Sequence, residues 1–329
     1  MDSALSRHKN KFRGIIACIL VALASKFLAL NYGAPAMLFA LILGMSVNFL
    51  SESEYSIPGI DFCSSTVLRF GVILLGSKIL FGDVLALGWV TALVVVGCMF
   101  ATILFGALIA KALKLDYRFG MLSGGAVGIC GISAAMTLSS VMPKSKEIEH
   151  YTLLTVVMVA TFGAIAMVVY PVLASFLGLS SQQMGIFIGG SIHDVSHVIG
   201  AGYSISEDVG YVAMIVKMLR VALLIPMAWI FLLIFTKQRA ASEVRTKLSP
   251  PYFLLGFVLL AIINNIGWIP QAAAEVMNTT SQDCFVVAIA ALGMKTSFKG
   301  LFNIGWRPVA MVLSESLFLG GLVLAWVML

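Results

Sequence analysis

The chain has 329 residues, of which 60% are hydrophobic and only 11% are charged, and its mean hydropathy is +1.03. A soluble protein of this length needs more charged residues, because most of its surface faces water. The net charge of +6 requires no nucleic-acid partner, since most lysines and arginines lie at the ends of apolar runs. Those runs are long enough to cross a bilayer, which predicts an all-α polytopic membrane protein.

The apolar runs predict about eleven transmembrane helices. They lie near residues 13–31, 34–50, 65–81, 86–110, 119–142, 152–178, 184–203, 208–236, 251–269, 283–296 and 306–328. We expect one membrane domain, 1–329, with halves near 1–178 and 179–329 related by an inverted repeat. The five cysteines are scattered without a CxxC pair, which argues against a disulfide framework or a zinc cage.

Basic loops predict the orientation, because they prefer the cytoplasmic side of the membrane. We therefore expect "RHKNKFR" at the N-terminus, "AKALKLDYR", "FTKQRAASEVRTKLSP" and "KTSFKG" to lie inside. The loops "NYGAP" and "SISED", the mixed-charge loop "MPKSKEIEH" and the C-terminus then fall outside. The stretch "RHKNKFR" runs directly into an apolar helix, which is typical of a retained first span and not of a cleaved signal peptide.

Two pairs of segments resemble each other. The first pair is "LGSKILFGDVLALGW" (75–89) and "LGMKTSFKGLFNIGW" (292–306), and the expected topology puts Lys78 outside and Lys295 inside. A repeat of opposite orientation is typical of inverted-repeat transporters, and the alternative is chance similarity in a chain of biased composition.

The second pair is "GMLSGGAVGICGIS" (120–133) and "GIFIGGSIHDVSHV" (185–198), with glycines that match at three positions. The expected topology gives both segments the same orientation, unless one of them is a re-entrant hairpin. The sequence leaves this alternative open.

A glycine-rich stretch lies inside the predicted span 119–142. Small groups that leave room for a ligand gather in it: Gly124, Gly125, Gly128, Cys130, Gly131 and Ser133. One interpretation is close helix packing through small residues. The other is a broken helix whose free backbone amides bind an ion near the middle of the membrane.

The stretch "GGSIHDVSHVIGAG" (189–202) places Gly189, Gly190, His193, Asp194 and His197 in an apolar run. On a helix, the two histidines share one face. Three interpretations compete: a metal site, which lacks a third ligand nearby; structural hydrogen bonds; and a proton or substrate site. Charged groups in a span usually line a cavity or find a partner, and histidine titrates near neutral pH.

The next predicted helix carries Lys217 and Arg220, three residues apart and therefore on one face. Both lie well inside the span. They form either a structural ion pair with Asp194 or Glu315, or a site for an anion whose oxygens suit the planar fork of arginine.

Further polar groups lie in or near the spans: Asn48, Asn264, Asn265, Ser314, Glu315 and Ser316. Glu315 is the most unusual, because it is a carboxyl group well inside the last span. It is a candidate coupling site for H⁺ or Na⁺.

In this order, "GGAVGICGISAAM", "GGSIHDVSHVIGAG" and "VKMLRVALLIP" resemble motifs of the YeiH family of bacterial inner-membrane proteins, and the similarity covers essentially the whole chain. The family's Cys-Gly-x-Ser-Ala core matches Cys130 to Ala134, its His-acid element matches His193–Asp194, and its Lys-x-x-Arg element matches Lys217–Arg220. At the position of His197 such sequences often have glutamine, which argues against a two-histidine metal site.

The resemblance implies a fold related to the bile-acid/sodium symporters and the sodium/proton antiporters. That fold has inverted repeats, crossed discontinuous helices, and separate core and panel domains. Members of the family are classed as sulfate exporters, and small organosulfonates are also proposed as substrates.

We therefore expect a secondary transporter of a small anion, an exporter of sulfate or a small organosulfonate, in the bacterial inner membrane with a cytoplasmic N-terminus. No Walker motif is present, so ATP is not the direct energy source. We expect no cofactor, H⁺ or Na⁺ as the coupling ion, and a homodimer as one option for the assembly.

Two alternatives stay open: an importer of small organic anions coupled to Na⁺ or H⁺, and a membrane enzyme or anion sensor. An enzyme needs a fuller acid–base set than His193, Asp194 and Cys130. A sensor needs a soluble output domain, and the loops are too short for one.

Overall fold

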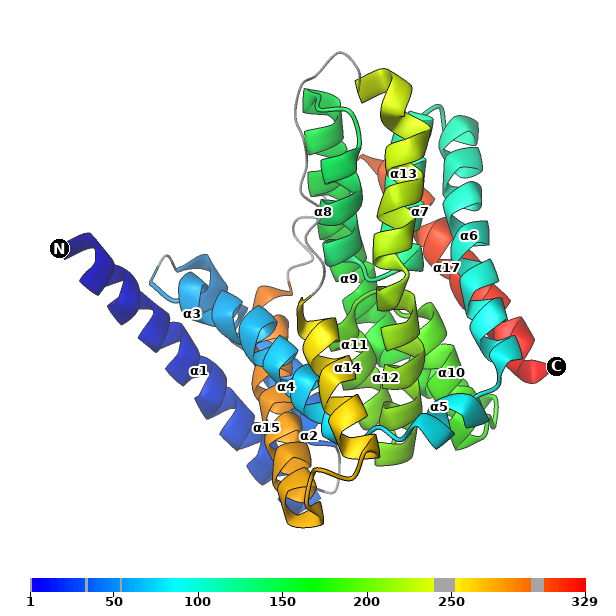
Figure 1. Ribbon diagram of the computed structural model, residues 1–329. Helices are drawn as coiled ribbons and strands as arrows, with labels where there is room; N and C mark the ends of the chain where they lie inside the picture. The colour runs from blue at the N-terminus through cyan, green and yellow to red at the C-terminus, as the bar shows by residue number, and fades with distance from the viewer. Residues whose placement is uncertain (1, 33–34, 54, 240–251, 297–304) are drawn as a thin grey trace. The chain divides into compact units, whose positions relative to one another are not determined.

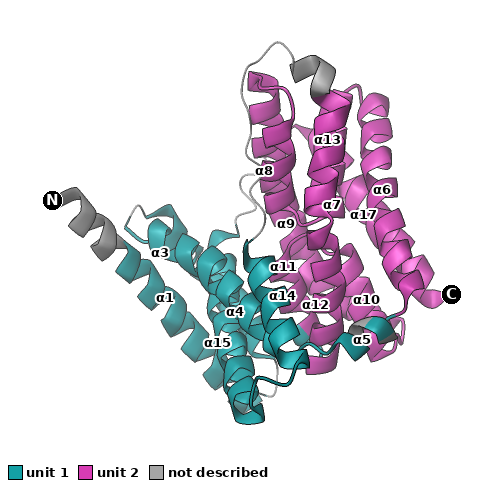
Figure 2. Ribbon diagram, in the orientation of Figure 1, with its two compact units in different colours: residues 1–87, 203–206, 251–297 teal, residues 88–202, 207–250, 298–329 magenta. Residues whose placement is uncertain are grey.

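A computed structural model describes residues 2–32, 35–53, 55–239, 252–296 and 305–329 (Figure 1). Within these ranges the regular elements are helices, as the composition predicts. The chain divides into two compact units, unit 1 (1–87, 203–206 and 251–297) and unit 2 (88–202, 207–250 and 298–329), shown in Figure 2. Each unit therefore combines segments from before and after residue 178.

Six helical stretches among the described residues are long and apolar enough to cross a membrane: Lys11–Tyr32, Ile57–Lys78, Trp89–Ala112, Lys146–Phe176, Glu207–Phe235 and Trp306–Met328. Shorter apolar helices accompany them. A polytopic membrane protein is thus supported, whereas the count of eleven spans is not.

Unit 1 contains α1 (Asp2–Tyr32), α2 (Ala36–Ser46), η1 (Asn48–Glu52), α3 (Ile57–Asp61), η2 (Phe62–Val67), α4 (Leu68–Leu75), η3 (Gly76–Lys78), α5 (Phe81–Ala86), α14 (Tyr252–Asn265) and α15 (Gln271–Lys295). Helix α15 packs against α1, α2 and α4. Gly44 of α2 and Gly293 of α15 let these two backbones touch, because a side chain on either glycine would meet the other helix.

The helical stretch Ile57–Lys78, which includes α3 and α4, runs antiparallel to α15. Lys295 Nζ pairs with Asp61 Oδ1 at 2.7 Å, and Ser281 Oγ donates to Gly71 O at 2.7 Å, so residues later in one helix face residues earlier in the other. Lys78 and Lys295 therefore lie at opposite ends of unit 1, as expected for segments 75–89 and 292–306. Residues 297–304 of the second segment lie outside the described residues.

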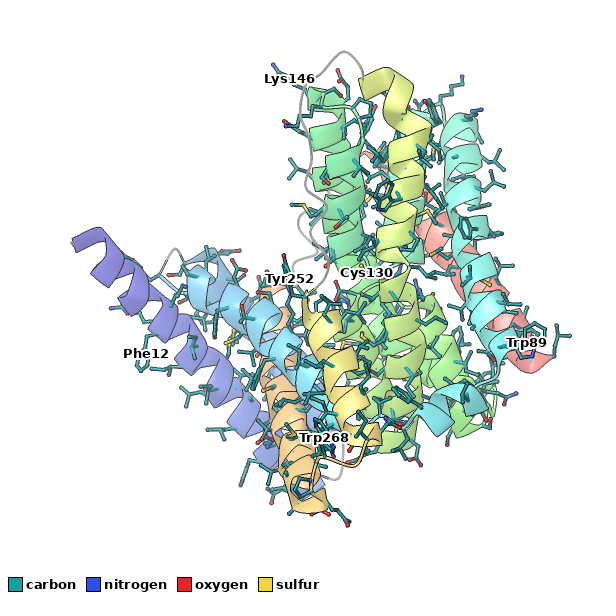
Figure 3. The ribbon with its side chains drawn as sticks, viewed as in Figure 1. Phe12, Trp89, Cys130, Lys146, Tyr252 and Trp268 are labelled. Carbon is teal, nitrogen blue, oxygen red and sulfur yellow. The ribbon has the colours of Figure 1, made fainter. Side chains whose placement is uncertain are left out.

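Unit 2 contains α6 (Trp89–Ala112), α7 (Tyr117–Gly128), α8 (Ile132–Val141), α9 (Lys146–Phe176), α10 (Ser181–Ser191), α11 (Val195–Tyr203, whose last residue belongs to unit 1), α12 (Glu207–Ala222), α13 (Leu224–Arg239) and α17 (Trp306–Met328). Trp89 and Lys146 mark opposite ends of this unit, and Cys130 lies between them (Figure 3).

The predicted span 119–142 is a re-entrant hairpin made of α7 and α8. Helix α7 runs back along α6, with Gly120 against Gly106 and Gly128 against Met99. Helix α8 then returns alongside α7, since a Cβ on Gly125 would lie 2.5 Å from Leu138 Cδ1. The hairpin enters and leaves unit 2 at the same end.

That end is rich in basic residues, and we call it the basic end. In and beside the loops that join α6 to α7 and α8 to α9 lie Lys111, Lys114, Arg118, Lys144 and Lys146. The first residues of α7 and α9 meet at this end, because the rings of Phe119 and Tyr151 stack with centroids 4.7 Å apart. The loop "MPKSKEIEH" thus lies at the same end of unit 2 as "AKALKLDYR", and its expected placement on the other side is wrong.

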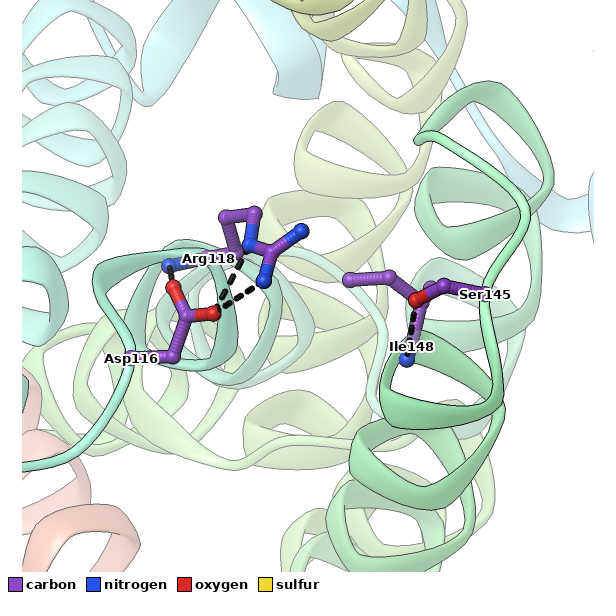
Figure 4. A network of polar contacts seen from close by, with 4 residues as sticks. All are labelled: Asp116, Arg118, Ser145 and Ile148. Atoms are coloured by element: carbon purple, nitrogen blue, oxygen red, sulfur yellow. Dashed lines mark hydrogen bonds and ion pairs between the residues drawn. The ribbon is translucent and has the colours of Figure 1, made fainter. Parts of the chain in front are cut away.

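At the basic end, side chains cap the first turns of α7 and α9 (Figure 4). Asp116 accepts a hydrogen bond from Arg118 N at 2.9 Å and from Arg118 Nε at 2.8 Å, and Ser145 Oγ accepts one from Ile148 N at 3.3 Å. Such caps satisfy amide groups that have no partner inside the helix. Partial burial raises the pKa of Asp116, but the hydrogen bonds and charge of Arg118 outweigh it and hold the pKa below its ordinary value.

The predicted span 184–203 is a second hairpin, made of α10 and α11. Helix α10 runs parallel to α12, because Gly185 lies against Val212 and Gly189 lies against Val216. Helix α11 runs the other way, with Gly202 against Gly210. This hairpin enters from the end opposite the basic end, so the segments 120–133 and 185–198 have opposite orientations and not the same one.

Candidate functional site

The tip of the first hairpin consists of Ile129, Cys130 and Gly131, between α7 and α8. Gly131 has φ +63° and ψ −119°, a backbone conformation that glycine adopts without strain and other residues do not. Cys130 is only 3% exposed, and Ser133 is half-buried in the first turn of α8. The first amides of α8 therefore start at the middle of unit 2, where helix geometry leaves them without intrahelical acceptors.

The tip of the second hairpin consists of Ile192, His193 and Asp194. Asp194 Oδ1 accepts hydrogen bonds from Ser196 N at 3.1 Å and from Ser196 Oγ at 2.9 Å. The carboxylate thus caps the first turn of α11, as aspartate does at many helix N-termini. This gives Asp194 a local partner that is not a lysine or an arginine.

The two tips meet. A Cβ on Gly131 would lie 3.5 Å from both Asp194 Oδ2 and His193 O. Lys217, which is fully buried, donates to Ile129 O at 2.7 Å, to Ile192 O at 2.9 Å and to His193 O. All three N–H groups of the ammonium are therefore used, and they join one tip to the other.

Arg220 joins the same two hairpins one turn further along α12. Its guanidinium donates to Val127 O at 2.7 Å and Gly128 O at 2.9 Å in the first hairpin. It also donates to Gly189 O at 3.0 Å and Ile192 O at 2.9 Å in the second. Val127 O, Gly128 O and Gly189 O lie in the last turns of α7 and α10, and Ile192 O belongs to the C-cap of α10. Carbonyl groups at a helix C-terminus lack partners inside the helix and attract cations.

The structure therefore pairs Lys217 and Arg220 with backbone carbonyl groups, and not with Asp194 or Glu315. Carbonyl groups carry no net charge. The tips hold two cations against the single carboxylate of Asp194, which leaves an excess of one positive charge if both cations are protonated.

His193 links the second tip to α17. Ser316 Oγ donates to Val312 O at 2.7 Å and has no second proton, so it accepts from His193 Nε2 at 2.8 Å, and the neutral ring then carries its proton on Nε2. Within the described part of the chain, His193 Nδ1 has no hydrogen-bond partner, and neither does either ring nitrogen of His197, which is 1% exposed and packs on Gly163. Among the described residues, no three His, Cys, Asp or Glu side chains could hold one metal ion.

Glu315 lies on the neighbouring face of α17 and is fully buried. Ser123 Oγ of α7 lies 2.7 Å from Glu315 Oε1, and Glu315 Oε2 has no hydrogen-bond partner among the residues that the structure describes. The motif analysis did not single out Ser123, although its signal is a hydroxyl group beside Gly124 and Gly125 in a predicted span. Glu315 and Ser316, which are adjacent in α17, thus contact different hairpins: Glu315 contacts Ser123 of the first, and Ser316 contacts His193 of the second.

Four of the predicted glycines lie inside helices and not at the breaks. A Cβ on Gly124 would lie 2.8 Å from Thr102 O, and one on Gly190 would lie 2.9 Å from Val323 Cγ1. Gly125 and Gly189 are equally close to neighbouring helices. Their geometry is that of close helix packing. In unit 1, Asn48 and Asn265 donate to the backbone carbonyl groups Thr296 O at 3.1 Å and Ile79 O at 2.8 Å.

Known proteins are similar to this chain over almost its full length. The family described as "Conserved hypothetical protein 698" matches residues 13–312. A UPF0324 membrane protein of Chlorobaculum tepidum is 46% identical, covering 98% of this chain and 91% of the relative. The chain belongs to the UPF0324 family.

This membership confirms the resemblance to the YeiH family. Another UPF0324 relative, named TauZ, from Paracoccus denitrificans, is 41% identical over 94% of this chain and 92% of its own length. A UPF0324 membrane protein of Staphylococcus aureus is 30% identical over 96% of both chains. No solved structure matches the chain.

Proposed function

We propose that this UPF0324 protein is a secondary transporter of a small anion, which exports sulfate or a small organosulfonate across the bacterial cytoplasmic membrane. The observation that carries the proposal is the meeting of two opposed hairpin tips at the middle of unit 2, where Lys217 and Arg220 are buried.

The chemistry of the tips suits an anion. Helices α8 and α11 both begin there, and the N-terminus of a helix offers free amide groups and the positive end of its dipole. The excess positive charge of the two cations adds an attraction of longer range. In this proposal Lys217 and Arg220 position the two tips by binding their carbonyl groups. Amide and hydroxyl groups near Ser133 and His197 contact the anion.

The arrangement also suits alternating access. A site between the tips is reached from the basic end past α7 and α8, and from the other end past α10 and α11. We assign the basic end to the cytoplasm, because lysine and arginine favour that side. Movement of one hairpin at a time then exposes the anion to one side only.

The test is counterflow in proteoliposomes. Vesicles that contain the purified protein and unlabelled sulfate, methanesulfonate or isethionate receive the labelled anion outside. We expect exchange of at least one of these anions above the level of protein-free vesicles. Asp116→Asn serves as a matched control for Asp194→Asn, because both residues cap a helix and only Asp194 lies at the tips.

The expected difference is a changed affinity for the anion in Asp194→Asn, with little change in Asp116→Asn. Exchange of cations or neutral solutes in place of anions would contradict the proposal. Imposed H⁺ or Na⁺ gradients in the same vesicles separate export from the import of organic anions, since the direction in which the anion moves relative to the ion shows the direction of coupling.

A further inference from the structure

The buried carboxyl group of Glu315 sits in a slot that two glycines create. A Cβ on Gly106 of α6 would lie 2.6 Å from Glu315 Oε1, and Gly120 of α7 packs directly against Gly106. Glu315 lies nine residues after the start of α17, which corresponds to about 13 Å along the helix axis. The carboxyl group therefore lies against Gly106, where the backbones of α6 and α7 touch, away from both ends of α17.

Ser123 has too few protons to make a full hydrogen bond to each of its two neighbouring oxygens while Glu315 is ionised. Ser123 Oγ lies 2.7 Å from Glu315 Oε1 and 3.3 Å from Gly120 O, and both of these oxygens are acceptors when the carboxyl group is ionised. A hydroxyl has one proton for two acceptors. If Glu315 is protonated, its O–H donates to Ser123 Oγ, and Ser123 donates to Gly120 O, so both contacts become hydrogen bonds.

Charge leads to the same conclusion. The hydrogen bonds of Lys217 and Arg220 go to backbone carbonyl groups, and no described side chain except Ser123 bonds Glu315. A carboxylate buried without a cation is strongly unfavourable in a membrane protein, whereas the neutral acid is tolerated.

Other groups that titrate or carry charge lie on the elements packed against α17: Cys98 and Lys111 on α6; Tyr117 and Arg118 on α7; Lys146, Glu147, Glu149, His150, Tyr151 and Tyr170 on α9; and His193 in the tip that follows α10. Apart from Tyr170 and the membrane-embedded Cys98 and His193, they lie near the basic end. His193 bonds Ser316, directly after Glu315 in the sequence.

From these contacts we propose that Glu315 is the proton-carrying group of the transporter, and that its protonation is coupled to the movement of the hairpins. The proposal rests on the proposed function. Loss of the proton leaves a carboxylate in the glycine slot, so ionisation requires α7 to move and water to enter. The proton then leaves to that water, and it returns from water on the other side of the membrane.

The coupling passes through α17. Glu315 contacts the first hairpin through Ser123, and the adjacent Ser316 contacts the tip of the second hairpin through His193. A shift of α17 after deprotonation therefore acts on both hairpins at once, which links the proton to the anion site.

The first experiment is infrared difference spectroscopy on the purified protein during a pH titration. We expect the C=O stretching band of a buried carboxylic acid, which disappears reversibly as the pH rises. The band is absent in Glu315→Gln, shifted in Ser123→Ala, and unchanged in Glu149→Gln, which removes an exposed carboxylate of unit 2. A Glu315 that is ionised throughout, or protonated at every pH, overturns the proposal.

The second experiment follows anion accumulation in proteoliposomes under an imposed pH gradient. In Glu315→Gln we expect no accumulation driven by the gradient, and an anion exchange that no longer depends on pH. Glu149→Gln should behave like the wild type. Accumulation by Glu315→Gln equal to the wild type, or accumulation driven only by a Na⁺ gradient, contradicts the proposal.

The two proposals fail in different ways. If the wild-type protein exchanges no anion at all, the proposed function fails, while the infrared band still reports on Glu315. If it exchanges anions but Glu315→Gln keeps the pH response, only the inference about Glu315 fails.

Discussion

Replacing Arg220 by methionine tests whether this cation holds the two hairpins together. The methionine keeps much of the buried volume and removes every donor. Val127 O, Gly128 O and Gly189 O then lose the hydrogen bonds that Arg220 provides, whereas Ile192 O keeps its bond from Lys217. A buried acceptor left unsatisfied costs about 1–3 kcal/mol, so the three together destabilise the protein by about 3–9 kcal/mol.

The lower end of that range is the better guide, because the variant no longer buries a charge. A loss of about 3 kcal/mol corresponds to a fall in melting temperature of about 4 °C for a protein of this size, because the unfolding entropy is about 2.1 cal/mol/K per residue. We expect Arg220→Lys to fall between the wild type and Arg220→Met, because an ammonium has three donors for four carbonyl groups.

The assay is thermal unfolding of purified protein in detergent, followed by intrinsic fluorescence. Arg307→Met is the matched control, since Arg307 is an exposed arginine at the start of α17 and its loss should change stability by less than about 0.5 kcal/mol. Equal melting temperatures for Arg220→Met and Arg307→Met, with both proteins folded, would refute the assigned role of Arg220.

Three further predictions follow from the packing and topology of unit 2. Gly120→Ala should destabilise the protein by about 1–3 kcal/mol, because the added Cβ would meet backbone atoms of α6. Gly97→Ala is the control in the same thermal assay: its Cβ would meet open space, so the change should be neutral or stabilising by up to about 1 kcal/mol. Cysteines introduced at Lys114 and Lys144 should react with an impermeant thiol reagent from the same side of the membrane; reaction from opposite sides would restore the simple span at 119–142. The pKa of Asp116 is lowered, so its contribution to stability is present above the unfolded-state pKa of about 3.9 and is lost as the pH falls through the folded-state value. In Asp116→Asn the melting temperature should therefore fall less steeply as the pH is lowered. A fall equal to that of the wild type would contradict the stabilising role of the Asp116 cap.

Composition and motif chemistry predicted the membrane class, the family and the residues that gather at the centre of unit 2. Glycine-flanked His193 and Asp194, and the buried pair Lys217 and Arg220, are conspicuous in an apolar chain because charge inside a membrane needs compensation. The structure brings all four to the two tips.

The hydropathy pattern alone does not predict the two hairpins. Two antiparallel half-helices with a short break between them have the same length and composition as one spanning helix, so 119–142 and 184–203 were both predicted as spans. The conformation of Gly131 and the cap at Asp194 reverse the chain, and neither feature changes the hydropathy.

The sequence also does not predict which groups Lys217 and Arg220 bond. Sequence reasoning seeks side chains of opposite charge, whereas Lys217 and Arg220 bond backbone carbonyl groups, which every residue has. Ser123 was missed for a related reason, since its importance depends on the slot that Gly106 and Gly120 form around Glu315.

The most direct test of the central claim is the position of a bound selenate in an experimental structure of the protein, located from the anomalous scattering of selenium. Selenate has the shape and charge of sulfate, so it should occupy the sulfate site. The account predicts one selenate between the hairpin tips, near the first turns of α8 and α11. Selenate bound within unit 1, or only at the ends of unit 2, would contradict it.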